Sequence, residues 1–140
     1  NCSPYIAPSM KGARQYGRPV ALEDIKAIEL IVCGSVAVNR KGARVGKGGG
    51  YSDVEFALLT EEKKIGRATP IVTSVHPLQI VDEEIPMTAH DIPLTAIVTP
   101  DEIIEIKDVL PSPKGVYWKM LPQEKIDAIP TLKDRSKRER

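Results

Sequence analysis

Long hydrophobic runs are missing from this sequence, and a charge excess of one sign is missing too. No stretch approaches the roughly 18 consecutive apolar residues that a membrane-spanning helix requires, and no secretory signal is visible. Twenty Lys and Arg residues are balanced by nineteen Asp and Glu residues, so the formal net charge is only +1. Binding to duplex nucleic acid depends on many unbalanced basic side chains. We therefore expect neither a membrane nor a nucleic acid as a partner.

Cysteine and large aromatic residues are also scarce. The two cysteines, Cys2 and Cys33, cannot form a metal site by themselves and are too few for a disulfide framework. Cys33 ends an apolar run, which is typical of a small buried thiol. Without a disulfide scaffold or a membrane segment, we expect a cytoplasmic protein in a reducing compartment.

The chain has room for one domain with a hydrophobic core, and not for two. We divide it into a lead-in over residues 1–27, an α/β domain over residues 28–132 and a basic tail over residues 133–140. Prolines and glycines interrupt the lead-in, which we interpret as an extended segment or as the end of an absent N-terminal region. The tail is more typical of a frayed, solvated terminus than of a nucleic-acid-binding arm.

Ile and Val dominate the apolar runs, as they do in strands that are buried on both faces of a parallel sheet. Short runs of β-branched residues predict strands over residues 28–33, 71–75 and 94–98. A turn is expected over residues 39–42. Strands that alternate with helices predict an α/β fold, with a three-layer, Rossmann-like, mostly parallel sheet and flanking helices.

Helix boundaries are marked at three places. Ser52 and Glu55 have the spacing of a capping box, and Gly66 is a credible stop for the helix that would follow. Residues 99–102, Thr-Pro-Asp-Glu, repeat the capping pattern with a proline at the first helical position. Residues 122–129 predict a short closing helix after a proline-rich loop.

The main functional signal is the glycine-rich stretch over residues 44–53, RVGKGGGYSD. Glycines allow positive φ angles and let backbone amides approach a ligand closely. Free amides that lead into the first turn of a helix attract anions, and Arg44 and Lys47 add positive charge at the same place. Asp53 would either cap the helix or hold a divalent cation that accompanies phosphates. The stretch matches neither a Walker A loop nor a dinucleotide fingerprint, but it still predicts a phosphate site. The alternative is a flexible surface turn.

A second polar loop, residues 85–93, precedes the third predicted strand. Because ligands of open parallel sheets collect at loops near one end of the strands, we expect this loop to face the glycine-rich one. Asp91 would then supply a second carboxylate for Mg²⁺, although an aspartate in such a loop more often bonds its own backbone. His76 and His90 have no third ligand at metal spacing, so we place them in turns or walls rather than in a zinc site. Tyr117 and Trp118 are expected in the core or in a cleft wall.

These stretches resemble the 5-formyltetrahydrofolate cyclo-ligases, also called methenyltetrahydrofolate synthetases. Residues 44–53 are similar to the family's Arg-Leu-Gly-x-Gly-x-Gly-Tyr-Tyr-Asp loop, and residues 86–99 to its Pro-x-x-x-x-Asp segment and the strand after it. Residues 34–38, Gly-Ser-Val-Ala-Val, together with residues 46–55, resemble more specifically the divergent branch of methenyltetrahydrofolate synthetase domain-containing proteins. The resemblance covers roughly residues 28–130 and marks residues 28–132 as a nucleotide-binding domain.

The resemblance implies a ligase of folate one-carbon metabolism that uses ATP and Mg²⁺. In that reaction ATP phosphorylates the formyl oxygen of 5-formyltetrahydrofolate, the ring closes and phosphate leaves to give 5,10-methenyltetrahydrofolate. The resemblance gives Arg44 and Tyr51 catalytic roles, and gives magnesium to Asp53 and Asp91. The residues implied to bind ATP are Arg44, Gly46, Lys47, Gly48, Gly49, Gly50, Tyr51 and Asp53.

Two features leave a second interpretation open. Ser52 stands where the family has a second tyrosine, and the family's N-terminal Lys and Arg residues have no match in residues 1–43. We therefore expect either the cyclo-ligase, represented by its C-terminal portion, or a non-catalytic nucleotide-binding or regulatory domain. A nucleic-acid module that uses the basic tail is the least favoured hypothesis.

Overall fold

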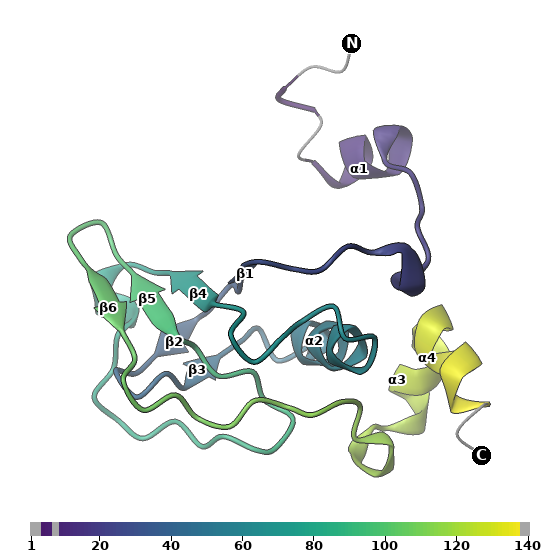
Figure 1. Cartoon of the computed structure of the whole chain (residues 1–140). Coiled ribbons are helices and arrows are strands. Elements are labelled where there is room, and N and C mark those ends of the chain that lie inside the picture. Colours follow the sequence, from purple (N-terminus) through teal and green to yellow (C-terminus); the bar gives the residue numbers. More distant parts are fainter. Residues whose placement is uncertain (1–3, 7–8, 138–140) are drawn as a thin grey trace.

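The computed structural model, which describes residues 4–6 and 9–137, contains a four-stranded open sheet at one side of the molecule (Figure 1). Its strand order is β1-β4-β5-β6, with β1 parallel to β4, β4 parallel to β5, and β6 antiparallel to β5. The strands are β1 (Ile31–Val32), β4 (Ile71–Ser74), β5 (Ala96–Val98) and β6 (Ile103–Glu105). Helices flank this mostly parallel sheet, which confirms the predicted Rossmann-like α/β fold.

The three predicted strands are those that form the parallel part of the sheet. Ile31 is in register with Ile71, and Thr73 is in register with Ile97. Ile71 and Ile97 are buried in one apolar cluster with Cys33, Phe56, Ile92 and Leu94. The dense β-branched runs are therefore strands because they fill the core of the sheet.

The predicted helix start over residues 99–102 is wrong, because this stretch is the turn of a β-hairpin between β5 and β6. The Thr99 hydroxyl accepts hydrogen bonds from the amides of Asp101 (3.2 Å) and Glu102 (3.0 Å), as an N-cap would. The Thr99 amide donates to the Glu102 carbonyl and closes the turn. Because the same hydroxyl-to-amide bonds occur in both motifs, the local pattern does not distinguish a turn from a cap.

Helix α2 (Tyr51–Glu61) follows the glycine-rich stretch directly. Its N-cap is Gly50 and it has no side-chain cap, so the predicted capping box of Ser52 and Glu55 is wrong. The helix ends before Lys63, whose φ of 55° reverses the chain ahead of the predicted stop at Gly66. A backbone reversal by a left-handed residue thus replaces the glycine stop.

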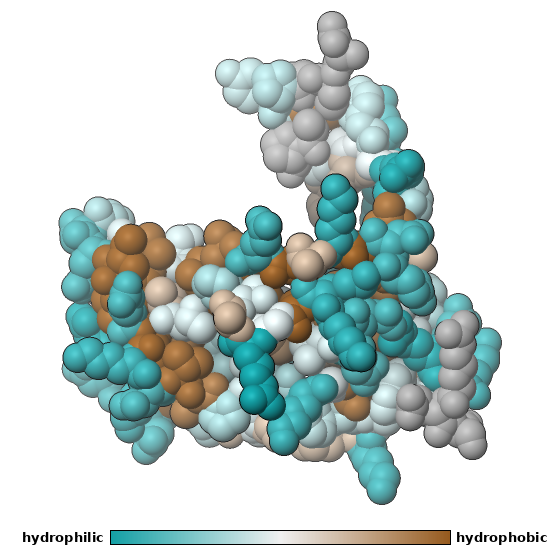
Figure 2. All heavy atoms as spheres, viewed as in Figure 1, coloured by the Kyte–Doolittle hydropathy of each residue, from teal (hydrophilic) through white to brown (hydrophobic). Residues whose placement is uncertain are grey.

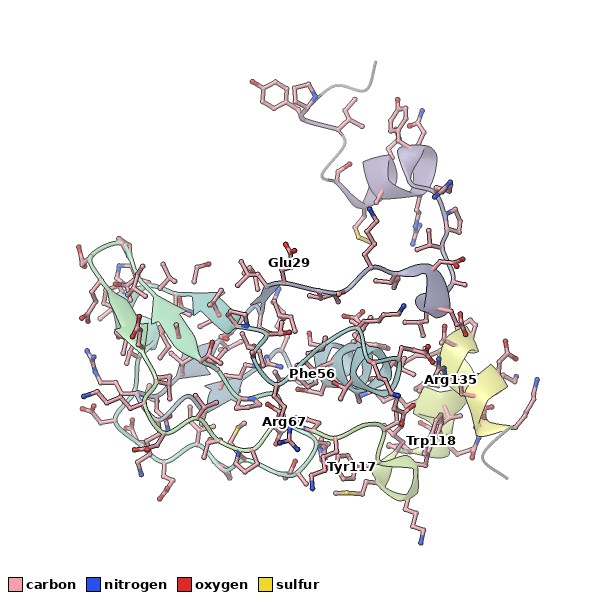
Figure 3. All side chains as sticks on the ribbon, in the orientation of Figure 1. Glu29, Phe56, Arg67, Tyr117, Trp118 and Arg135 are labelled. Carbon is pink, nitrogen blue, oxygen red and sulfur yellow. The ribbon has the colours of Figure 1, made fainter. Side chains whose placement is uncertain are left out.

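Two apolar clusters hold α2 in place. Phe56 packs into the cluster of the sheet, whereas Val54 and Leu58 pack with Ile126 and Leu132 from the C-terminal helices. These helices are α3 (Gln123–Ala128), where a closing helix was predicted, and α4 (Pro130–Ser136). Helix α4 extends helical structure into the stretch predicted to be a basic tail, of which residues 138–140 lie outside the described part. Arg135 of α4 pairs with Glu61 and Glu62 at the end of α2 (Figure 3).

The remaining elements are short. Strands β2 (Ala37–Val38) and β3 (Arg44–Val45) form an antiparallel ribbon, closed by the predicted turn at residues 39–42. The 3-10 helices are η1 (Leu22–Asp24), η2 (Pro77–Gln79) and η3 (Trp118–Met120). Helix α1 (Met10–Tyr16) lies away from the sheet at the N-terminal end (Figure 1).

Hydrophobic residues gather over the strands on the face shown in Figure 2, and hydrophilic residues cover much of the helical side. The exposed apolar residues of the strands include Val32 and Ile103, which lie on the two outer strands of the sheet. Within residues 4–6 and 9–137, no helix has both the length and the apolar character needed to cross a membrane.

Candidate functional site: a cavity above the glycine-rich loop

The β2–β3 ribbon delivers the glycine-rich loop to the first turn of α2. In the turn of the ribbon, the Asn39 side-chain oxygen accepts hydrogen bonds from the amides of Lys41 and Ala43, both at 3.1 Å. Strand β3 then leads through residues 46–50 into α2 without an intervening element. Gly48 and Gly50 have φ angles of 84° and 59°, which a side chain would disfavour. The backbone of the loop therefore favours glycine at these two positions, immediately before the first turn of α2.

A buried ion pair joins the two ends of the loop. Arg44 Nη2 lies 3.0 Å from Asp53 Oδ1, and the two side chains are only 5% and 18% exposed. Arg44 Nη1 donates to the Gly34 carbonyl at 3.3 Å, and its buried Nε has no hydrogen-bond partner among the described residues. Asp53 Oδ1 also accepts from the amide of Ile92 at 3.2 Å. The pair therefore ties β3, α2 and the second polar loop together.

A cavity of about 520 Å³ opens above this ion pair. Its size is within the range of small-molecule sites. Four parts of the chain form its wall: the glycine-rich loop, α2, the polar loop and the segment 115–125. The lining residues are Arg44, Val45, Gly46, Gly48, Gly50, Asp53, Val54, Ala57, Ile85, Pro86, His90, Asp91, Gly115, Val116, Tyr117, Met120, Leu121, Pro122 and Lys125.

The structure brings most of the sequence-predicted site residues to this cavity. Arg44, Gly46, Gly48, Gly50, Asp53 and Asp91 line it. Lys47, Gly49 and Tyr51 do not; all three are exposed, and Tyr51 is 57% exposed. Ser52 lines a different groove beside β1, so the position at which the family has its second tyrosine lies outside this wall.

Asp91 is a turn residue that also lines the cavity. Its Oδ2 accepts hydrogen bonds from the Thr88 amide (2.6 Å) and the Thr88 hydroxyl (2.7 Å), which is the behaviour of a turn residue. It nevertheless lines the same cavity as Asp53, whose carboxylate accepts from the amide next to Asp91 in sequence. Asp53 and Asp91 therefore line one cavity.

Asp53 and Asp91 are the carboxylates of the cavity wall that could contribute to a magnesium site. The described residues contain no cluster of three or more His, Cys, Asp or Glu side chains that would hold a metal alone. Mg²⁺ typically takes one or two carboxylates, several waters and the phosphates of its ligand. Asp53 and Asp91 can supply the protein's share of such a shell.

Histidines and aromatic residues occupy the predicted walls and turns. His76 accepts from the Leu78 amide and caps η2, while His90 lines the cavity beside the Thr88 hydroxyl. Tyr117 belongs to the cavity wall, and Trp118 packs against the second apolar cluster near α3 and α4 (Figure 3).

Cys33 is a buried thiol, as expected from its place at the end of an apolar run. Burial raises the pKa of Cys33 above its ordinary value, Arg44 acts in the opposite direction, and Asp53 adds to the rise. A neutral thiol is a poor nucleophile, and Cys33 packs in the apolar cluster of the sheet.

Apart from Tyr117, sequence reasoning missed the C-terminal wall of the cavity, and Lys125 in particular. Lys125 Nζ donates to the Gly49 carbonyl at 2.6 Å and lies 5.4 Å from the centre of the Tyr51 ring. No motif surrounds this lysine, which follows a Gln-Glu pair in a short charged helix. Lys125 reaches the glycine-rich loop because α3 packs against α2 through the apolar contacts of Ile126.

Comparisons with known proteins identify the family to which the chain belongs. The profile of the 5-formyltetrahydrofolate cyclo-ligase family matches residues 9–100. The mouse and human methenyltetrahydrofolate synthase domain-containing proteins are 37% and 39% identical to the chain over 131 residues, which are 93% and 92% of this chain and 35% and 34% of those proteins. The mitochondrial 5-formyltetrahydrofolate cyclo-ligase of Arabidopsis thaliana is 30% identical over 104 residues, which are 72% of the chain and 38% of that protein. The chain thus spans about a third of the length of these curated relatives, and it belongs to the 5-formyltetrahydrofolate cyclo-ligase family.

Proposed function

We propose that the cavity binds ATP with Mg²⁺ and that the chain is the nucleotide-binding portion of a 5-formyltetrahydrofolate cyclo-ligase. The main support is that the glycine-rich loop, the first turn of α2, Asp53 and Asp91 all contribute to the wall of one cavity. In the proposed reaction, ATP and 5-formyltetrahydrofolate give 5,10-methenyltetrahydrofolate, ADP and phosphate. The proposal includes the cytoplasm as the compartment, since the free, buried thiol of Cys33 suits reducing conditions.

Each group of residues has a distinct part in this proposal. The amides of residues 46–50 would cradle the phosphates, and Asp53 and Asp91 would hold Mg²⁺. When bound, Mg²⁺ would neutralise negative charge on the phosphates. Arg44 fixes the Asp53 carboxylate through its 3.0 Å ion pair, so it acts as a positioning residue. Phosphoryl transfer depends on such positioning more than on a protein nucleophile, and the site needs no Ser-His-Asp arrangement.

Lys47 and Tyr51 belong to the exposed rim of the loop. In the proposal they contact the phosphates and the folate when the bound ligand draws the loop inward. The alternative is a nucleotide-binding or regulatory domain without folate chemistry. The exposure of Tyr51 favours this alternative, because the ring that would border the folate does not line the cavity. The two candidates share the ATP site and differ in the response to folate.

The test is titration calorimetry of the chain with ATP and Mg²⁺, repeated in the presence of 5-formyltetrahydrofolate with phosphate release measured in parallel. The cyclo-ligase proposal predicts Mg²⁺-dependent ATP binding and phosphate release that starts only when the folate is added. ATP binding without any response to the folate would support the non-catalytic alternative. Absence of ATP binding in the folded chain would refute both.

A further inference from the structure

One wall of the cavity is built by a segment that lies outside the family match. The match ends at residue 100, whereas seven lining residues lie between positions 115 and 125. The similarity to the mouse relative covers 93% of the chain and therefore extends past residue 100. The matched range of the family profile therefore does not reach this wall.

The segment is fixed to the helix that begins at the glycine-rich loop. The amide of Val116 donates to Glu61 Oε1 at 2.8 Å, near the end of α2. Ile126 of α3 is 6% exposed and packs with Val54 and Leu58 of α2. Residue 125 adjoins this buried anchor, so its backbone position relative to the loop is set by apolar packing.

Lys125 is the cation that this wall brings to the loop. Its Nζ bonds the Gly49 carbonyl and lies so close to Gly50 that a Cβ there would sit 2.6 Å from it. Within the described part of the chain, Lys125 forms no ion pair with a carboxylate; its partners are a neutral carbonyl and the Tyr51 ring. An ammonium group on a flexible stem without a counter-ion can move to a stronger acceptor at little cost.

We propose that Lys125 is a phosphate-binding residue of the site, supplied by the C-terminal segment. When a polyphosphate enters the cavity, the ammonium leaves the Gly49 carbonyl and pairs with a phosphate oxygen above the loop. The segment 115–125 thereby makes the site selective for ligands that carry a phosphate chain. This inference rests on the proposed function only in placing phosphates at the glycine-rich loop.

The experiment measures binding of three probes to the full chain: ATP with Mg²⁺, inorganic tripolyphosphate and adenosine. Lys125→Met removes the charge with little change in shape, Lys125→Arg keeps the charge, and Lys119→Met alters an exposed lysine of the same segment that does not line the cavity. Loss of one charge-assisted hydrogen bond predicts that Lys125→Met weakens binding of ATP and tripolyphosphate about tenfold to a hundredfold. Adenosine affinity stays unchanged, Lys125→Arg restores most of the loss, and Lys119→Met behaves as the wild type.

Salt dependence separates a direct phosphate contact from a structural tether on Gly49. A direct contact makes ATP binding less sensitive to salt in Lys125→Met than in the wild type, because one screened charge pair is gone. A loss with unchanged salt dependence, or binding within twofold of the wild type, would overturn the inference.

The wild-type measurements separate this inference from the proposed function. Tripolyphosphate binding that depends on Lys125, without ATP binding, would support the lysine's role and refute the nucleotide site. Equal ATP binding by the wild type and Lys125→Met would support the nucleotide site and refute the role of Lys125. A wild-type chain that binds neither probe would overturn both.

Discussion

At the scale of single residues, the Arg44–Asp53 pair matters most because it is both structural and central to the cavity. Arg44 is buried, and its guanidinium bonds the Gly34 carbonyl as well as the carboxylate. Asp53 in turn receives the Ile92 amide. One carboxylate oxygen therefore joins the glycine-rich loop to the polar loop that carries Asp91.

Arg44→Met is expected to lower the free energy of unfolding by about 3 kcal/mol, because it leaves the largely buried Asp53 carboxylate without its partner. Urea denaturation measures the change. Arg40→Met is the matched control, since Arg40 forms an exposed pair with Glu102 that should contribute less than about 1 kcal/mol. Equal effects of the two substitutions would contradict the structural role of the Arg44–Asp53 pair.

The buried thiol of Cys33 predicts a pH effect on stability. Because burial raises its pKa in the folded chain above the ordinary value of 9.0, the folded state favours the neutral thiol. The corresponding stabilisation is fully present below pH 9 and is lost as pH rises through the folded-state pKa. The free energy of unfolding of the wild type should therefore fall more steeply above pH 9 than that of Cys33→Ala. Parallel curves for the two proteins would contradict this account.

At the scale of elements, local patterns predicted the buried parallel strands correctly but failed at one turn and at one charged helix. The dense β-branched runs gave the correct parallel strands, since burial on both faces selects such residues. Residues 99–102 misled the helix prediction, because a threonine hydroxyl satisfies amides equally well in a turn and at a cap. Helix α4 was missed because its single fully buried residue, Leu132, lies among charged neighbours and produces no apolar period.

Leu132→Ala is expected to destabilise the chain by about 3 kcal/mol, because it opens a cavity in the cluster shared with α2. Thr131→Ala, at an exposed neighbouring position of α4, is the control and should change stability by less than about 0.5 kcal/mol. Thermal or urea denaturation compares them. A neutral Leu132→Ala would mean that α4 is not packed on α2.

At the scale of the whole molecule, four segments form the wall of the cavity: the glycine-rich loop, α2, the polar loop and residues 115–125. The positions of the glycine-rich loop and of Asp91 at the cavity were predictable. The loop is marked by its own glycines and charges, and Asp91 lies in a loop near one end of the parallel strands, where ligands of such sheets bind. Apart from Tyr117, the wall over residues 115–125 was not predictable, since it depends on how α3 packs against α2. Lys125 is therefore a residue that only the assembled fold places in the site.

The most direct test of a magnesium–nucleotide site is the effect of Mg²⁺ on ATP affinity in the wild type, Asp91→Asn and the exposed control Asp82→Asn. The account predicts that Mg²⁺ strengthens ATP binding at least tenfold in the wild type and in Asp82→Asn, and that Asp91→Asn loses most of this gain. ATP affinity without Mg²⁺ should be similar in all three. An Asp91→Asn variant that keeps the full effect of Mg²⁺ would contradict the shared role of Asp53 and Asp91.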